Sequence, residues 1–341
     1  MVNPTTKDLA EFAGVSLATV DRVLNNRPNV SQKTRLKVQD AIKQTGFVRN
    51  RAAVNLLRNR PYKFRFLFPD SGDQYLNELL LEVEHAKFAL RTDMTIVEAD
   101  QQEMRDPHAI ANYLGDIEKS DIDGIAVMAP ESPPVRDAIA RLHERGVHVV
   151  QFLSGQESLD ALDFVGVNNF AAGATAGRIL GRFLGARTGS IMVITDTMMS
   201  SDSIERRHGF DRVLNSKFPN LKALPSLETY GNKKQAQKII SNQIVHNDDV
   251  IGVYVISSEA RLTVEIIKKS LELTKTVLIV HERTPFSEKA LRNEEIDAII
   301  AQNPGHAVRS ALRILRARSE GREPIAAQEN VRIEVLFCEN L

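Results

Sequence analysis

The chain has 341 residues, of which 43% are apolar, so its length favours two or three compact units with hydrophobic cores. Its formal net charge is zero, but residues 1–65 contain 13 Lys/Arg and 4 Asp/Glu, whereas the remainder contains 31 and 40. A basic front of this kind favours a polyanionic partner, either nucleic acid or an anionic membrane. The single cysteine, Cys338, excludes an intrachain disulfide framework and a cysteine-rich zinc site.

The sequence does not open on a basic and then apolar segment typical of secretion signals. No apolar run approaches the roughly 18 residues of a membrane span. We therefore expect a cytoplasmic protein with no membrane partner.

The first 47 residues predict three short helices. The residues predicted to cap and stop them are Thr5 or Thr6, Gly14, Ser16, Ser31 and Gly46. The apolar side chains predicted to face inward are Leu9, Ala10, Phe12, Ala13, Val20, Val23, Leu24, Leu36, Val38, Ile42 and Phe47. A glycine-containing turn between the first two helices is typical of a helix-turn-helix.

The outward face of the second helix suits DNA, because a helix fits the major groove and only its outward side chains reach base edges. Arg22 can bond a guanine bidentately, whereas Leu17 and Ala18 suit thymine methyl groups. The other polar candidates for DNA contact, mostly short donors near helix starts, are Ser16, Thr19, Asn25, Ser31, Thr34 and Asn50. The alternative is a helical protein-binding module with a solvated basic face.

Four segments occur here in order: AGVS, TVDRVLN, VSQKTRLKV and GFVRNRAA. Residues 5–53 thereby resemble the DNA-binding headpiece of the LacI (LacI/GalR) family of bacterial transcription regulators. Asp21 stands where the family usually carries a serine. Because phosphates repel a carboxylate, we expect Asp21 to weaken DNA affinity or to orient Arg22.

Residues 51–60 suit a short helix, but a helix of this length folds only against a partner. The resemblance implies a hinge helix that pairs with its twin across a homodimer and inserts Leu56 into the minor groove. A plain linker with Leu56 or Leu57 buried is the alternative.

From Lys63 onward, apolar runs alternate with segments of helix length, a rhythm typical of parallel sheets with right-handed crossovers. The runs are FRFLF, MTIVEA, GIAVMA, HVVQFL, FVGV, SIMVIT, VIGVYVI, TVLIV, AIIA and VRIEVLF, and the helical segments include 77–90, 170–184, 203–218, 233–245 and 307–320. Since about ten strands is many for one open sheet, we predict an α/β fold: an all-α N-terminal headpiece and two doubly wound parallel subdomains. The predicted division is 1–60, with the hinge helix at 51–60, and 61–341. Ligands of such folds bind outside the carboxyl ends of the strands.

Motifs for catalysis are missing from the sequence. Neither a phosphate-binding glycine loop nor G-x-S-x-G or H-E-x-x-H occurs, and the eight histidines are scattered. GATAG at 173–177 lies in a predicted helix and indicates close packing. His281 and Glu282 would point to opposite faces if the strand continued through them. The sequence therefore disfavours an enzyme and predicts no cofactor, metal or catalytic residue.

The second part also resembles the LacI family, whose effector domain is similar to type I periplasmic sugar-binding proteins. FVGVNNFAAGATAGRILGRFLG matches the pattern VxxDNxxxGxxAxxxLxxxG, with Asn168 in place of the usual aspartate, and ERRHGF matches RxxGF. The resemblance implies that Arg206 binds the effector, since an arginine fork can hold two hydroxyls or one carboxylate; a surface ion pair is the alternative. Glu282 is expected to replace the family's hydroxyl-binding aspartate. The weaker candidates, for which ordinary loop chemistry is the alternative, are Asp70, Gln74, Tyr75, Ser154, Ser257 and Gln302.

These observations predict a homodimeric, sequence-specific DNA-binding regulator that reads a pseudo-palindromic operator. A small polar effector, most simply a sugar or polyol, would set its DNA affinity; for a repressor, the effector would release DNA. A solute-binding protein and an α/β enzyme acting on sugars, neither with a DNA role, are the alternatives.

Overall fold

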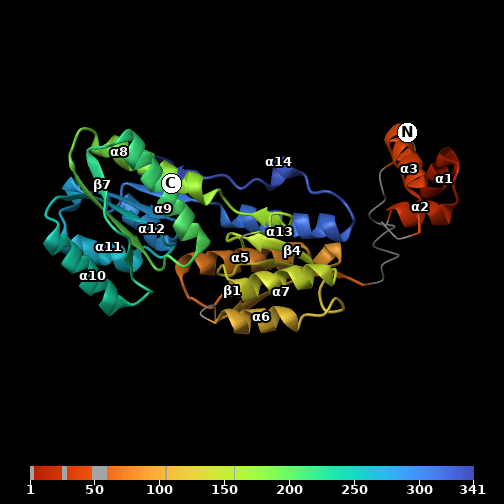
Figure 1. Ribbon diagram of the computed structural model, residues 1–341, viewed down its shortest axis with the longest axis horizontal. Helices are drawn as coiled ribbons and strands as arrows, with labels where there is room; N and C mark the ends of the chain where they lie inside the picture. Colours follow the sequence, from red (N-terminus) through yellow and green to blue (C-terminus); the bar gives the residue numbers. More distant parts are fainter. Residues whose placement is uncertain (1–3, 25–28, 48–59, 104–105, 157) are drawn as a thin grey trace.

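The computed structural model describes residues 4–24, 29–47, 60–103, 106–156 and 158–341. The headpiece consists of three helices: α1 (Thr6–Ala13), α2 (Leu17–Leu24) and α3 (Gln32–Thr45) (Figure 1). Thr5 caps α1 reciprocally with Asp8: each side chain accepts a hydrogen bond from the other's backbone amide. Ser31 caps α3, and Gly14 and Gly46 end α1 and α3 in the left-handed conformation, as the sequence predicted.

The core of the headpiece is smaller than predicted. Phe12 and Leu36 are 58% and 54% exposed, so the expectation that both face inward is wrong. With about 100° between successive residues of a helix, Leu36 lies about 160° around α3 from the fully buried Val38. The buried side chains of this core are Leu9, Ala10, Val20, Val23, Val38, Ala41 and Phe47.

The remainder forms two lobes, each built on one sheet. The sheet of the N-terminal lobe is parallel in the order β2-β1-β3-β4-β5. Its strands are β1 (Tyr62–Pro69), β2 (Thr95–Gln102), β3 (Gly124–Val127), β4 (His148–Phe152) and β5 (Asp163–Val165).

The sheet of the C-terminal lobe has the order β12-β11-β10-β9-β6-β7, with β8 also paired to β6. Its strands are β6 (Gly189–Thr195), β7 (Leu221–Ala223), β8 (Leu227–Glu228), β9 (Val250–Val255), β10 (Val277–His281), β11 (Ala298–Ala301) and β12 (Glu334–Leu336). All pairings are parallel except that of β12 with β11. All ten predicted apolar runs contain a strand; the short β7 and β8 were not predicted.

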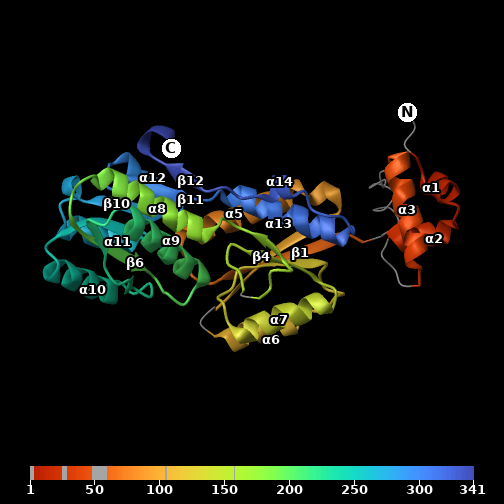
Figure 2. The ribbon, with the colours of Figure 1, turned by 45° about the horizontal axis from the view of Figure 1, so that its top comes forward.

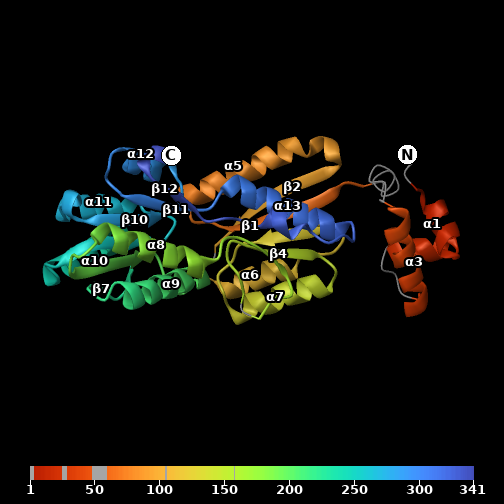
Figure 3. The ribbon, with the colours of Figure 1, turned by 90° about the horizontal axis from the view of Figure 1, so that it is seen from above.

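Helices cover both faces of each sheet (Figures 2 and 3). In the N-terminal lobe, α5 (Gln74–Ala89) and α13 (Pro304–Ser319) cover one face, and α6 (Pro107–Gly115) and α7 (Pro133–Glu144) cover the other. In the C-terminal lobe, α8 (Asn169–Leu184) and α9 (Ser201–Lys217) lie opposite α10 (Lys233–His246), α11 (Arg261–Ser270) and α12 (Pro285–Arg292). The short helices are η1 (Arg91–Asp93), η2 (Leu273–Lys275), α14 (Ala326–Glu329) and η3 (Cys338–Asn340). This is the doubly wound arrangement that the sequence predicted.

The chain passes between the lobes three times, because α13 packs on the N-terminal sheet although β11 and β12 before and after it belong to the C-terminal sheet. The first passage joins β5 to α8. The α8 and α9 backbones approach closely through Gly173 and Gly209: a Cβ at Gly173 would lie 1.8 Å from the Arg206 carbonyl oxygen. The GATAG segment thus serves close packing, as predicted.

Candidate functional site

The α2 surface of the headpiece presents Leu17, Ala18, Asp21 and Arg22 to solvent, as the helix pattern predicted. The face opposite it carries the buried Val20 and Val23. The short apolar side chains therefore stand beside a guanidinium on one exposed stripe. This combination suits the edges of a major groove.

The predicted phosphate contacts lie at the starts of α2 and α3. The Ser16 and Thr19 hydroxyls are 2.8 Å apart, and so are those of Ser31 and Thr34. In each pair the serine oxygen also accepts the amide hydrogen of the threonine, at 3.1 and 3.2 Å. These hydroxyls sit where the helix dipole and the free amides favour an anion. Asn25, Asn50, Leu56 and positions 51–59 of the predicted hinge helix lie outside the described residues.

The candidate effector residues meet at Arg206, which lies on α9 and is 4% exposed. Its Nε donates to Asn169 Oδ1 at 2.9 Å, and its Nη1 donates to the Ile256 carbonyl oxygen at 2.9 Å. Its Nη2 donates to Glu282 Oε1 at 3.2 Å, forming a buried ion pair. Arg206 thus joins α8, the end of β9 and the end of β10. Asn169 and Ile256 were not among the predicted site residues; the second asparagine of FVGVNN was the available signal.

Glu282 connects Arg206 to Gln302. Gln302 donates its Nε2 to Glu282 Oε1 at 3.2 Å and its backbone amide to Glu282 Oε2 at 3.3 Å. Its Oε1 accepts the amide hydrogen of Val167, in the first passage between the lobes, at 3.3 Å. Burial raises the pKa of Glu282, while Arg206 and Gln302 act in the opposite direction. The Glu282 carboxylate is therefore kept ionised by Arg206 and Gln302 against the effect of its burial.

The expected opposite orientation of His281 and Glu282 required the strand to continue through both residues. The strand β10 ends at His281, so this requirement is not met. Glu282 has a φ of 63°, in the left-handed region that non-glycine residues rarely adopt. His281 Nε2 lies 2.7 Å from the Tyr254 hydroxyl. Burial, with Arg206 nearby, lowers the pKa of His281 well below its usual range, so the ring is neutral.

Tyr75 and Gln74 bring the start of α5 to the same region. Tyr75 is 3% exposed, and its hydroxyl has no partner of hydrogen-bond geometry among the described residues, although the Gln302 side chain is nearby. Burial and the charge of Glu282 raise the pKa of Tyr75 well above its usual range. Gln74 Oε1 accepts the amide hydrogen of Phe286 at 3.1 Å, a direct contact between the lobes.

The remaining candidates are less closely joined to this network. Asp70 follows β1 and is exposed, and Ser257 follows β9 and is half-buried. Ser154 follows β4 and donates its hydroxyl to the Ala129 carbonyl oxygen at 3.1 Å. All three lie at carboxyl ends of strands, where the fold places ligands.

Comparison with known proteins identifies both parts of the chain. Residues 5–50 match the family described as bacterial regulatory proteins, lacI family, and residues 64–323 match the periplasmic binding protein domain. The chain belongs to the periplasmic binding protein domain family and carries a lacI-family DNA-binding domain in front of it. It is 31% identical over 128 residues to catabolite control protein A of Priestia megaterium, a match covering 38% of this chain and 37% of that protein. It is 30% identical over 177 residues to the HTH-type transcriptional repressor PurR of Pectobacterium carotovorum, covering 52% and 50%. The matches thus span half of these relatives or less.

Solved structures share the fold of the part of the chain that follows the headpiece. A periplasmic solute-binding protein of an ABC transporter from Actinobacillus succinogenes, with bound D-allose, superposes with a TM-score of 0.73 at 15% identity, covering 82% of this chain and 98% of that one. The matched families and the names of these relatives are those of regulators and binding proteins, not of enzymes. No group of three or more His, Cys, Asp or Glu side chains in the described ranges is placed to hold a metal ion. None of the helices described is long and apolar enough to cross a bilayer.

Asn168, which stands where the LacI-family pattern has an aspartate, still serves as a helix cap. Asn168 caps α8, because its Oδ1 accepts the Ala171 amide hydrogen at 2.8 Å. An asparagine supplies this acceptor as well as an aspartate does, but adds no charge beside the Arg206 network.

Proposed function

We propose that this protein is a homodimeric transcription regulator that binds an operator through its headpiece and releases or holds it in response to a small polar effector. The observation that carries this proposal is the lacI-family match over residues 5–50, together with the exposed α2 stripe of Leu17, Ala18 and Arg22. We retain the division into a DNA-binding domain, 1–60, and an effector-binding domain, 61–341. As a regulator of bacterial genes it works in the cytoplasm.

Exposed apolar side chains on neighbouring elements support the homodimer. Leu81 and Phe88 are exposed on α5, about two helical turns apart on the same face. Phe88 is 76% exposed. Ile96 is exposed on the edge strand β2, which contacts α5. Exposed apolar side chains at a sheet edge favour association with another chain. A second copy of the chain covers them, and its two-fold axis matches a pseudo-palindromic operator.

The Arg206 network supports a polar, uncharged effector. Glu282 already balances the guanidinium charge, so a ligand needs hydrogen-bonding groups and no net charge. The bound D-allose of the structural neighbour favours a sugar or polyol. The network reaches Val167 and Gln302, between the lobes, so a ligand that prefers one lobe arrangement shifts the population of arrangements and thereby the operator affinity.

The test begins with selection of operators from random duplexes, followed by fluorescence anisotropy at several salt concentrations. Specific duplexes are expected to bind with a log–log salt slope of about 0.9 for each phosphate contacted. Arg22→Met is expected to cost about 1 to 3 kcal/mol and to relax the preference at one base pair. Lys43→Met, at the exposed end of α3, is the matched control. A protein that binds no duplex at any salt concentration would instead be a solute-binding protein or an enzyme.

Effector control is tested on the same duplex by titrating sugars and polyols. The expected result is a change in operator affinity with a ligand whose binding Arg206→Met abolishes. If a sugar binds the protein and leaves operator affinity unchanged, the switch is refuted while DNA binding stands.

A further inference from the structure

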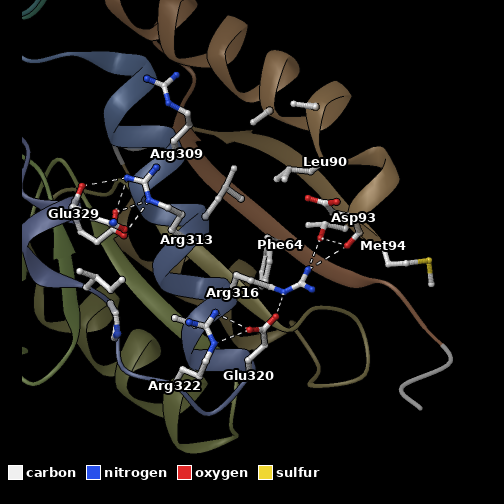
Figure 4. Close-up of a pocket in the computed structure, with 18 of the residues that line it drawn as sticks. Phe64, Leu90, Asp93, Met94, Arg309, Arg313, Arg316, Glu320, Arg322 and Glu329 are labelled. Carbon is white, nitrogen blue, oxygen red and sulfur yellow. Dashed lines mark hydrogen bonds and ion pairs between the residues drawn. The ribbon is translucent and has the colours of Figure 1, made fainter. Parts of the chain in front are cut away.

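A cavity lies in the N-terminal lobe, away from the Arg206 network. It has a volume of about 860 Å³ and opens between the C-terminal halves of α5 and α13, beneath residues 322–329 (Figure 4). A volume of this size suits a drug-sized ligand. No residue of the Arg206 network lines it.

The two sides of this cavity differ in chemistry. Apolar side chains gather on the side of α5 and β1, where Glu82 and His85 also line the cavity, and Phe64 of β1 lies between Leu90 and the arginines in Figure 4. The apolar residues of the lining include Phe64, Ala86, Leu90, Met94, Leu312 and Ile325. The opposite wall is a row of arginines along α13, Arg309, Arg313 and Arg316.

Two of these arginines retain donors for a ligand. The charged contact that the described structure gives Arg309 is a long one, 3.5 Å to Glu82, and its side chain is 57% exposed. Arg313 uses its Nε and Nη2 to hold the buried Glu329, which leaves Nη1 without a hydrogen bond among the described residues. Arg316, by contrast, is bound to Glu320 and to the Thr95 hydroxyl.

We propose that this cavity binds a small organic anion with an apolar body. Arg309 and Arg313 hold the anionic head, since guanidinium forks match the geometry of oxyacids. The body lies on Phe64, Leu312 and Leu90. Of the carboxylates in the lining, Glu320 and Glu329 already accept hydrogen bonds from arginines, and Glu82 forms the long ion pair with Arg309 that the anionic head would replace.

The same cavity touches the place where the chain enters the lobe. The Arg316 guanidinium lies 3.8 Å from the centre of the Tyr62 ring, at the start of β1. The Tyr62 amide donates to the Met94 carbonyl oxygen at 2.8 Å, and Met94 lines the cavity. A bound anion therefore lies beside Arg316 and Met94, the lining residues that hold Tyr62 at the start of the lobe. The effect of the anion on operator affinity rests on the proposed function, whereas the binding of the anion to the cavity does not.

The test compares two fluorescent probes that differ in one group, on the full chain without DNA. Anilinonaphthalene sulfonate carries an anionic head, and phenylnaphthylamine is the same aromatic body without it. We expect the sulfonate to bind at one site per chain and Arg309→Glu to weaken it about tenfold or more, with phenylnaphthylamine binding unchanged. Ala89→Trp, an exposed lining position, is expected to block both probes.

Two control variants separate the cavity from other surfaces. Arg292→Glu makes the same charge reversal at an exposed site on α12, and Phe88→Ser removes the most exposed part of the apolar α5 stripe. Both are expected to leave sulfonate affinity unchanged. If Arg309→Glu binds the sulfonate like the unaltered chain, or if Phe88→Ser abolishes binding, the proposal is overturned. The proposal is also overturned if sulfonate binding is lost when the protein concentration is raised until the chain dimerises. A second copy of the chain would then cover the cavity.

Displacement identifies the class of anion. Indole acetate, an aromatic carboxylate, is expected to displace the sulfonate, whereas glucose phosphate, with a polar body, is expected not to. Stronger displacement by glucose phosphate would refute the apolar body. A displacing anion that binds but leaves operator affinity unchanged would refute the coupling through Tyr62 and leave the binding site standing.

Discussion

Replacing Arg206 by methionine tests the reasoning about the buried network. The ion pair to Glu282 spans 3.2 Å, and at an effective dielectric constant of about 20 its Coulomb energy is about 5 kcal/mol. Methionine fills a similar volume but leaves the Glu282 carboxylate buried without its counter-ion. We expect a loss of about 3 to 5 kcal/mol in the free energy of unfolding at neutral pH.

The pH dependence of this loss follows from the pKa of Glu282. Without Arg206, that raised pKa rises further. A carboxyl group whose folded-state pKa is raised stabilises the fold below its unfolded pKa, and this stabilisation disappears as pH rises through the folded-state pKa. The deficit of Arg206→Met relative to the unaltered chain is therefore expected to be largest near about pH 8 and to shrink toward about pH 5.

Urea denaturation of both single variants and the double variant Arg206→Met/Glu282→Gln measures the coupling. The double variant carries no buried charge at these positions, although Asn169 Oδ1 and the Ile256 carbonyl lose their donor. We expect it to recover about 2 kcal/mol or more relative to the sum of the single losses. Simple additivity, or a deficit of Arg206→Met that does not change with pH, would refute the account of the pair.

Three further substitutions test local features. Gly209→Ala places a Cβ 1.9 Å from the Phe170 carbonyl oxygen and is expected to cost more than about 3 kcal/mol, measured by urea denaturation, whereas Gly115→Ala, with open space around it, is expected to be neutral or slightly stabilising. Thr5→Ala removes the α1 cap and is expected to cost the headpiece about 1 kcal/mol, read from amide exchange in α1; an unchanged exchange rate would contradict the capping box. Asp21→Ser is expected to change operator affinity or base preference in anisotropy titrations, and no change would refute a role for that carboxylate.

Periodicity and punctuation in the sequence were enough to predict the layout of the fold. The caps at Thr5 and Ser31 and the glycine stops are local signals, and each apolar run in the body is long enough to identify a buried parallel strand. The short β7 and β8 have no such run, because lysine, proline and serine interrupt the apolar positions of LKALPSLE, residues 221–228. Phe12 and Leu36 were misassigned because three short helices enclose only one narrow core, and helical spacing alone does not show its width.

The site could be predicted only in part for a different physical reason. The sequence placed Arg206, Glu282 and Gln302 at ends of elements, and the structure brings them together. The partners Asn169 and the Ile256 carbonyl depend on how α8, α9 and β9 meet, which is a tertiary property. Nothing in the sequence pattern indicated the cavity between α5 and α13, since their facing residues read as ordinary helix surface.

The strand β1 connects both proposed ligand sites to the headpiece. It begins at Tyr62, under the Arg316 guanidinium, and ends at Pro69, shortly before Tyr75 at the Arg206 network. Asp123 fixes its first residues, because its carboxylate accepts hydrogen bonds from the Arg60 side chain and the Lys63 amide. A parallel strand paired on both sides moves as a rigid unit with its sheet. A ligand at either end of β1 thus acts on the same element, so the two sites are expected to be coupled reciprocally in their binding free energies.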